Sequence, residues 1–318
     1  MSHQHDNAPA DPDDEHEHEH EIGRLAELVT LRDWLRYAVT RFNHAGIFCG
    51  HGLIDSYDEA AYLLLHTLAL PLDRLEPFLD ACITTEERRA LLEVIERRAE
   101  ERIPAAYLTG EAWLGDFRFK IDPRVIIPRS YFAELLDGGL DPWIGDPASI
   151  GSALDMCTGS ACLAILMAHA FPAASITAVD LSEEALEVAQ QNVSDYQLEE
   201  QIELVCSDLF EAIPDARFDL IISNPPYVTS DAMAVIPREY RHEPAMALGA
   251  GDDGLDVVRR LIAQAGRHLT PGGILAVEVG HNRHYVESAF PSLPMTWLST
   301  SDGDDRVFLL TREQLQGC

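Results

Sequence analysis

The spacing of apolar residues divides the chain into segments of different kinds. Residues 22–102 carry apolar side chains at helical spacing. Three helices are expected there, over about residues 31–42, over residues 62–70 and after Thr84. Thr30 is the expected cap of the first helix, and Ser56 with Glu59 forms a predicted capping box before the second. This segment therefore predicts a small helical domain.

Strand spacing begins after the helical segment. Within residues 103–127, Phe117, Phe119 and Ile121 alternate with polar residues, which predicts a β-hairpin linking two domains. From residue 128 to residue 318, short apolar runs alternate with helical stretches, a pattern typical of a mostly parallel sheet with helices on its faces. Seven strands are expected, beginning near Ser152, Ser175, Ile202, Phe218, Ile274, Met295 and Val307.

The strongest chemical signal is the turn Asn224-Pro225-Pro226-Tyr227, which directly follows an apolar strand. The two prolines cannot donate backbone hydrogen bonds, and each restricts the residue before it to extended geometry. The Asn224 side chain and the Pro225 carbonyl therefore offer two acceptors on a rigid frame, suited to a planar NH2 group. Ligands bind at the carboxyl ends of parallel strands, where this turn is expected to lie. Taken alone, the turn could equally serve only to end a strand.

Polar residues after the preceding strands strengthen the functional interpretation. Small residues after the strand at Ser152 allow a ligand to approach the backbone beside a helix N-terminus. Asp180 ends the next strand, 21 positions after Gly159, close to the spacing at which nucleotide-binding units place a carboxylate on ribose hydroxyls. Asp208 follows the third strand. Four successive strands thus each end in candidate binding groups.

These motifs, in this order, resemble those of class I S-adenosylmethionine-dependent methyltransferases of the protein N(5)-glutamine type, over roughly residues 25–312. The matching segments are residues 105–110, 124–130, 157–160, 224–227, 239–244 and 251–256. The release-factor branch of this family usually continues its Ile-Pro-Arg segment with a second proline, then Glu and Thr. Ser130-Tyr131-Phe132 stands here instead, which favours the branch that acts on large-subunit ribosomal protein L-three. Ala161 also departs from the family, which commonly has glycine there; a positive φ would make its methyl group cost about 1 kcal/mol or more.

The resemblance implies a Rossmann-like, seven-stranded α/β domain whose last strand is antiparallel, with S-adenosyl-L-methionine as cofactor and no metal. The implied cofactor-binding residues are Asp155, Thr158, Gly159, Ser160, Asp180, Asp208, Leu209 and Asn224. Asn224, Pro225, Pro226 and Tyr227 would bind the substrate amide, with Asn224, Pro225 and Tyr227 contributing to catalysis. The helical domain would recognise the protein substrate or, alternatively, only pack against the main domain.

Three other functions remain open at this point. The framework is shared with enzymes that methylate release factors, the turn would also suit a nucleic-acid adenine amino-methyltransferase, and the fold could serve a noncatalytic ribosome-assembly factor. The balance of 54 acidic against 23 basic residues opposes binding to phosphates, so no sequence-specific nucleic-acid binding is expected. The acidity would either steer a basic protein toward the site or reflect a proteome adapted to salt.

Composition also bounds the location of the protein. Residues 1–21 hold eight acidic residues and no Lys or Arg, which predicts a disordered tail whose histidines could bind zinc or nickel weakly. Neither an apolar run of membrane-helix length nor a signal peptide is visible, so no membrane partner and a cytoplasmic location are expected. The six cysteines are expected to be small buried thiols.

Overall fold

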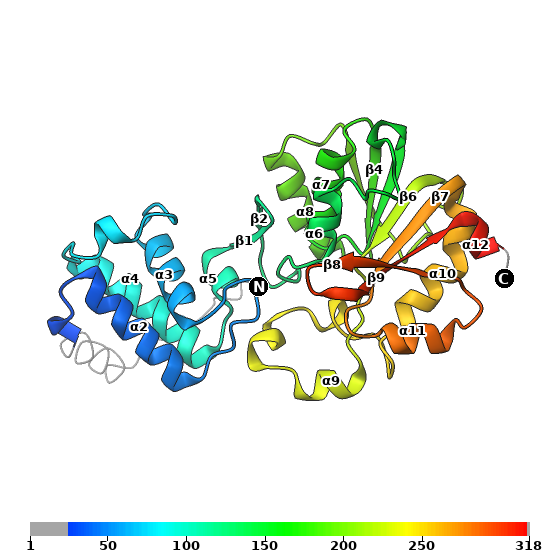
Figure 1. Ribbon diagram of the computed structural model, residues 1–318. Coiled ribbons are helices and arrows are strands. Elements are labelled where there is room, and N and C mark those ends of the chain that lie inside the picture. The colour runs from blue at the N-terminus through cyan, green and yellow to red at the C-terminus, as the bar shows by residue number, and fades with distance from the viewer. Residues whose placement is uncertain (1–24, 317–318) are drawn as a thin grey trace, which may run out of the picture. The chain divides into compact units, whose positions relative to one another are not determined.

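A computed structural model describes residues 25–316 (Figure 1). These residues fall into two compact units, the first ending at Thr109 and the second beginning at Gly110. The acidic tail at 1–21, the start of the expected helical domain at 22–24 and Cys318 lie outside the described residues. Each unit has its own hydrophobic core.

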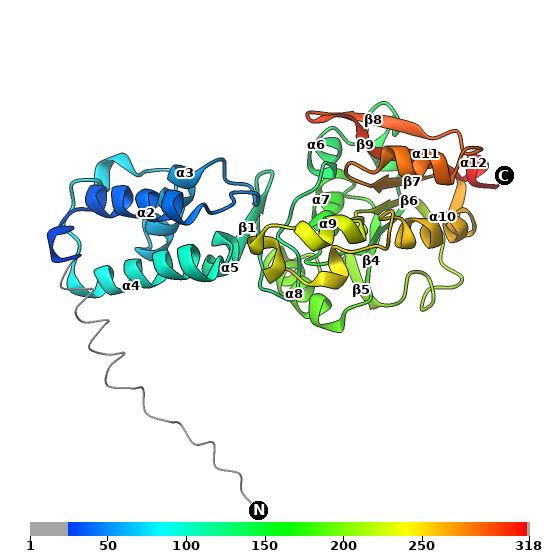
Figure 2. The same ribbon diagram turned by 90° about the horizontal axis from the view of Figure 1, so that it is seen from below.

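The first unit is helical, as its apolar spacing predicts. Figures 1 and 2 both show its three main helices packed as a small bundle. The helices and short helical turns are η1 (Leu25–Glu27), α2 (Leu31–Ala45), α3 (Ser56–Thr67), η2 (Glu76–Phe78), α4 (Thr85–Glu96), η3 (Arg97–Glu101) and α5 (Ala105–Thr109). Trp34, Phe42, Leu64 and Ile95 lie fully buried between them. Burying these large side chains is the main stabilising term for such a bundle.

The caps of α2 and α4 lie where the sequence predicts these helices to begin, at Thr30 and Thr84. Thr30 accepts a hydrogen bond from the Asp33 amide while the Asp33 carboxylate accepts one from the Thr30 amide. Thr84 and Glu87 form the same reciprocal pair at the start of α4. Each pair satisfies backbone donors that the first helical turn leaves without partners.

The predicted capping box before the second helix is wrong. Asp55 caps α3, because its carboxylate accepts from the amides of Tyr57 and Asp58 at 2.8 and 3.0 Å. Glu59 instead lies buried in the bundle and forms an ion pair with Arg98. A charge in the core requires such a partner, so Glu59 is drawn inward rather than back to the helix start.

The second unit is built on a seven-stranded sheet in the order β5-β4-β3-β6-β7-β9-β8. The strands are β3 (Ser152–Met156), β4 (Ser175–Asp180), β5 (Ile202–Cys206), β6 (Phe218–Ser223), β7 (Leu269–Glu278), β8 (Thr296–Thr300) and β9 (Gly303–Thr311). β9 pairs antiparallel with both of its neighbours, and the other pairings are parallel. The predicted fold class is therefore confirmed.

Helices cover both faces of this sheet. Figure 1 shows α6, α7 and α8 on one face and α10 and α12 on the other. The helices are α6 (Phe132–Asp137), α7 (Cys162–Ala170), α8 (Glu183–Asp195), α9 (Ser230–Val235), α10 (Asp256–His268), α11 (Arg283–Ala289) and α12 (Arg312–Gln316). Short turns η4 (Pro147–Ser149), η5 (Arg238–His242) and η6 (Ala245–Ala247) complete the unit. The central strands β3 and β6 are buried along nearly their whole length, as expected for a sheet covered on both faces.

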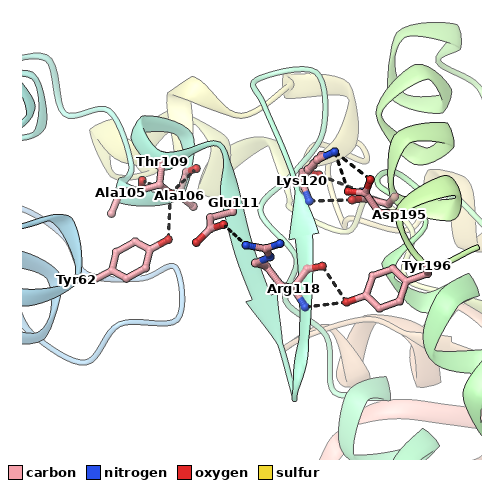
Figure 3. A network of polar contacts seen from close by, with 10 residues as sticks. Tyr62, Ala105, Ala106, Thr109, Glu111, Arg118, Lys120, Asp195 and Tyr196 are labelled. Carbon is pink, nitrogen blue, oxygen red and sulfur yellow. Dashed lines mark hydrogen bonds and ion pairs between the residues drawn. The ribbon is translucent and has the colours of Figure 1, made fainter. Parts of the chain in front are cut away.

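The predicted hairpin consists of β1 (Glu111–Leu114) and β2 (Phe117–Lys120), and it is fastened to the end of α8 (Figure 3). The Tyr196 hydroxyl accepts from the Arg118 amide at 3.0 Å and donates to the Arg118 carbonyl at 2.9 Å. Lys120 pairs with Asp195 at 2.8 Å. Asn192 bonds both backbone groups of Lys120 and also donates to the Ser160 carbonyl at 2.9 Å, so the hairpin supports the turn after β3.

Two remaining expectations concern cysteines and membranes. The expectation of buried thiols is wrong for Cys82 and Cys206, whose side chains are exposed. None of the helices within residues 25–316 combines the length and apolar character needed to cross a bilayer.

Candidate functional site

The strand order places a ligand site at the carboxyl edge of the sheet. From β3 the chain proceeds outward to β4 and β5, then returns to pair β6 on the other side of β3. A crevice opens at such a reversal because the two connections diverge there. A cavity with about 840 Å³ of empty space, partly open to solvent, occupies this position. Six of the residues expected to form the site line it: Gly159, Asp180, Asp208, Leu209, Asn224 and Pro226.

Asp180, at the end of β4, is held by backbone groups on both sides. One carboxylate oxygen accepts from the Gly159 amide at 2.8 Å, and the other accepts from the Ser182 amide at 2.9 Å. Burial raises the pKa of this carboxyl, whereas these backbone bonds act to lower it. Each oxygen retains a second lone pair, so the carboxylate can accept two further hydrogen bonds from a ligand.

Asp208 and Leu209 extend the cavity wall beyond β5. The Asp208 carboxylate lies 2.8 Å from the Arg260 guanidinium of α10, and both side chains line the cavity. Leu209 is buried with φ of 53°, a left-handed conformation that costs energy for a side chain of this kind. Together they present one acidic group beside an apolar surface.

Asp155, Thr158 and Ser160 are not among the residues that line the cavity. Asp155 is fully buried, and one of its oxygens accepts from the Thr158 hydroxyl at 2.6 Å and the Ala164 amide at 3.0 Å. Its other oxygen has no hydrogen-bond partner among the described residues. Burial raises the pKa of Asp155 to about 7. These side chains therefore lie outside the cavity wall and stabilise the turn between β3 and α7.

That turn contains three residues with positive φ in five positions. Cys157, Gly159 and Ala161 have φ values of 65°, 55° and 61°. The position of Ala161 therefore does require the left-handed conformation that glycine adopts freely, and its methyl group costs about 1 kcal/mol or more. Backbone strain of this kind is concentrated at ligand-binding turns.

The Asn224-Pro225-Pro226-Tyr227 turn follows β6 and is fixed by residues 129 and 243. The Asn224 side chain donates through its amide nitrogen to the Arg129 carbonyl at 3.2 Å, which leaves the amide oxygen as the group available to accept. Arg129 is bound by both oxygens of the buried Glu243, at 2.5 and 2.6 Å. Burial acts to lower the pKa of Arg129, but the Glu243 bonds raise it above its usual value. Pro225 is buried, and neither it nor Tyr227 is among the cavity-lining residues.

Sequence reasoning missed part of the cavity wall. Several of these residues lie in segments that matched the family but had no assigned role: Arg124, Val125, Ile126 and Pro244. Met246, Ala247, Val257 and Arg260 also line the cavity, and they carried no chemical motif. The matching segments at 124–130 and 239–244 were the one signal that could have pointed to this wall.

Comparison with known proteins identifies the family. The methyltransferase small domain family matches residues 146–238, which include β3, β4, β5 and β6 with the turns that follow them. The ribosomal protein uL3 glutamine methyltransferase of Neisseria meningitidis serogroup A is 58% identical over 291 residues, which cover 92% of this chain and 96% of that relative. The chain belongs to the ribosomal protein uL3 glutamine methyltransferase family.

Relatives with the same name from other organisms also match along most of the chain. The uL3 glutamine methyltransferase of Bordetella pertussis is 55% identical over 289 residues, covering 91% of this chain and 97% of the relative. That of Bradyrhizobium diazoefficiens is 46% identical over 301 residues, with 93% and 94% covered. Membership makes the chain a protein methyltransferase of a family that uses S-adenosyl-L-methionine, which confirms the expected family and enzyme class.

Proposed function

We propose that this family member transfers a methyl group from S-adenosyl-L-methionine to the side-chain amide nitrogen of a glutamine in ribosomal protein uL3. The observation that carries the proposal is the orientation of Asn224. Its amide nitrogen is engaged by the Arg129 carbonyl, so an acceptor oxygen remains at the cavity that Asp180 and Asp208 also line. The names of the relatives at 46–58% identity supply the substrate.

The residues of the cavity fit the cofactor. Asp180 would accept from the two ribose hydroxyls, because both of its oxygens keep a lone pair after bonding Gly159 and Ser182. Asp208 would accept from the adenine amino group, and Leu209 would cover the base with an apolar surface. Asp155, Thr158 and Ser160 would act by holding the turn that approaches the cofactor. When bound, S-adenosyl-L-methionine supplies the methyl group as an electrophile on a sulfonium sulfur.

The turn after β6 would prepare the amide nitrogen for attack. A primary amide nitrogen is a poor nucleophile, because its lone pair is delocalised into the carbonyl. If the Asn224 oxygen and the Pro225 carbonyl accept its two N–H bonds, they fix its position and stabilise positive charge that develops on nitrogen. Pro226 and Tyr227 would exclude water from the amide. The surplus proton can leave to solvent after transfer, so no metal or nucleophilic residue is needed.

The helical unit would bind the protein substrate. Its surface includes exposed apolar side chains at Ile54, which is 86% exposed, and at Tyr57, close to Asp55 and Asp58. An apolar contact flanked by carboxylates suits a basic protein segment. We expect Ile54→Glu to raise KM for uL3 and leave cofactor affinity unchanged. A ribosomal protein as substrate also implies action in the cytoplasm.

A substrate panel tests the proposed function. The enzyme is incubated with cofactor and, separately, with unmodified uL3, a release factor and DNA, and any added methyl group is located by mass spectrometry. We expect N5-methylglutamine in uL3 alone, formed about 100- to 1000-fold more slowly by Asn224→Ala protein. Methylation confined to a release factor, or to adenine, would overturn the proposal.

A further inference from the structure

Residues at and just after the end of β7 contact Tyr227, the last residue of the turn that would bind the amide. Three of the five residues at 278–282 contact it: Glu278, Gly280 and Asn282. None of them belongs to a segment that matched the family in the sequence. We call residues 278–282 the Tyr227 cradle.

The three contacting residues of the cradle restrain different parts of Tyr227. The Asn282 side chain donates to the Tyr227 carbonyl at 2.6 Å. Gly280, with φ of 53°, lies against the ring, and a Cβ atom there would come within 2.8 Å of the ring edge. The Tyr227 hydroxyl lies 3.4 Å from a Glu278 oxygen, to which it donates. Backbone, ring and hydroxyl are therefore each held from one short segment.

Glu278 also contacts the segment that holds Asn224. Its second oxygen accepts from the Ser130 hydroxyl at 2.5 Å and from the Tyr131 amide at 3.0 Å. Ser130 directly follows Arg129, whose carbonyl accepts from Asn224. Glu278 thus links Tyr227, at one end of the amide-binding turn, to the segment that follows the partner of Asn224.

The burial of Glu278 points to a specific role. This side chain is 1% exposed, and a buried carboxyl destabilises a fold unless hydrogen bonds compensate. Its donors are the Tyr227 hydroxyl and the Ser130 segment, and Arg129 adds a nearby positive charge. An apolar side chain at the end of β7 would avoid the cost of burial but would leave the Tyr227 hydroxyl without this acceptor.

We propose that the Tyr227 cradle is a positioning element for methyl transfer, in which Glu278 sets the Tyr227 ring and the Ser130 segment in one fixed arrangement. The inference rests on the proposed function, since the glutamine amide is the group that Tyr227 covers. Glu278 acts through Tyr227 and does not itself contact the reacting atoms.

A double-mutant cycle tests this role. Tyr227→Phe, Glu278→Gln and the double variant are compared for kcat and KM with uL3, and for cofactor affinity by calorimetry. Tyr227→Phe removes the donor of this hydrogen bond, and Glu278→Gln replaces its charged acceptor with a neutral amide, so each single change should lower kcat about 3- to 10-fold. The kcat of the double variant should be no lower than that of the less active single variant, because the effects of coupled residues do not add. Cofactor affinity should stay within about two-fold, which a general loosening of the fold would not permit.

Tyr196→Phe is the matched control, because it removes a phenolic hydroxyl with two hydrogen bonds to Arg118 but leaves the Asn192 bonds that join the hairpin to the turn after β3. It should leave kcat unchanged. Gly280→Ala provides a second route that keeps Glu278: the added methyl would displace the ring, and kcat should fall at least about 10-fold. This variant serves if Glu278→Gln fails to fold.

The outcomes separate the two proposals. If Asn224→Ala shows its expected loss of turnover on uL3 but the Tyr227 and Glu278 effects multiply, or Gly280→Ala is fully active, the proposed function stands and the cradle is overturned. If wild-type enzyme leaves uL3 unmodified, the proposed function fails and the cradle inference falls with it.

Discussion

Replacing Asp180 by Ala should weaken cofactor binding without unfolding the protein. Both Asp180 oxygens bond backbone amides, at 2.8 and 2.9 Å, so the carboxylate is already fixed when a ligand arrives. A hydrogen bond to a charged group contributes about 1.5 to 3 kcal/mol, and losing that much affinity makes binding about 10- to 150-fold weaker.

Calorimetric titration of cofactor at pH 8 measures this effect. The pH is chosen because burial raises the pKa of Asp180, and the wild-type carboxylate should be ionised during the comparison. Thermal unfolding of each protein, recorded without cofactor, separates a loss of affinity from a loss of structure.

Asp219→Ala is the matched control for this experiment. Asp219 also accepts from two backbone amides, those of Gly151 and Ser152 at 3.0 Å, but it lies near the start of β6 rather than at a strand end. It should lower the unfolding temperature and leave cofactor affinity unchanged. Affinity within two-fold of wild type for Asp180→Ala, or an equal loss for both variants, would refute the assigned role.

Three further outcomes are expected. Asn224→Ala should bind cofactor normally and lower turnover on uL3 about 100- to 1000-fold, because one preorganised acceptor is lost. Activity within a few-fold of wild type would contradict the proposed hydrogen bond from the substrate amide to Asn224. Burial raises the pKa of Asp155 to about 7. The contribution of Asp155 to the free energy of unfolding is therefore complete below the ordinary pKa of an aspartate and is lost as the pH rises through 7. The unfolding free energy of wild type relative to Asp155→Asn, from urea denaturation without cofactor, should therefore fall by about 2–3 kcal/mol between pH 5 and pH 8, and a constant difference would exclude the titration. Deleting residues 1–21 should leave kcat and KM unchanged, and a lower kcat in steady-state assays would assign the tail a role.

Local signals in the sequence were sufficient for the sheet and for part of the site. Apolar runs such as Phe218–Ser223 end at turn residues, and the rule that parallel strands bind ligands at their carboxyl ends brings Asp180, Asp208 and Asn224 together. The expected start of β7 at Ile274 was five residues late. The Thr-Pro-Gly-Gly sequence at 270–273 is typical of a turn, yet β7 begins at Leu269 and pairs with β6 through a register shift.

The remaining site residues depend on distant contacts that no local pattern encodes. Glu278 is a single acidic residue at the end of an apolar run, and its partner Tyr227 is 51 positions away. Val257 and Arg260 reach the cavity because α10 packs beside the turn after β5, and in the sequence they belong to an ordinary amphipathic helix. The sequence favoured Ser56 as the cap of α3, whereas Asp55 caps that helix and Glu59 pairs with the distant Arg98.

The hairpin contact at Lys120 has a practical consequence for chemical labelling. Lys120 is the only lysine in the sequence, and its side chain is 55% exposed while it pairs with Asp195. An amine-reactive dye therefore has one ε-amino group to modify, at a defined place between β2 and α8. The same hairpin is bonded through Asn192 to the turn that approaches the cofactor. A fluorophore on Lys120 would thus lie outside the cavity, on an element bonded to the turn that approaches the cofactor, with no cysteine introduced or removed.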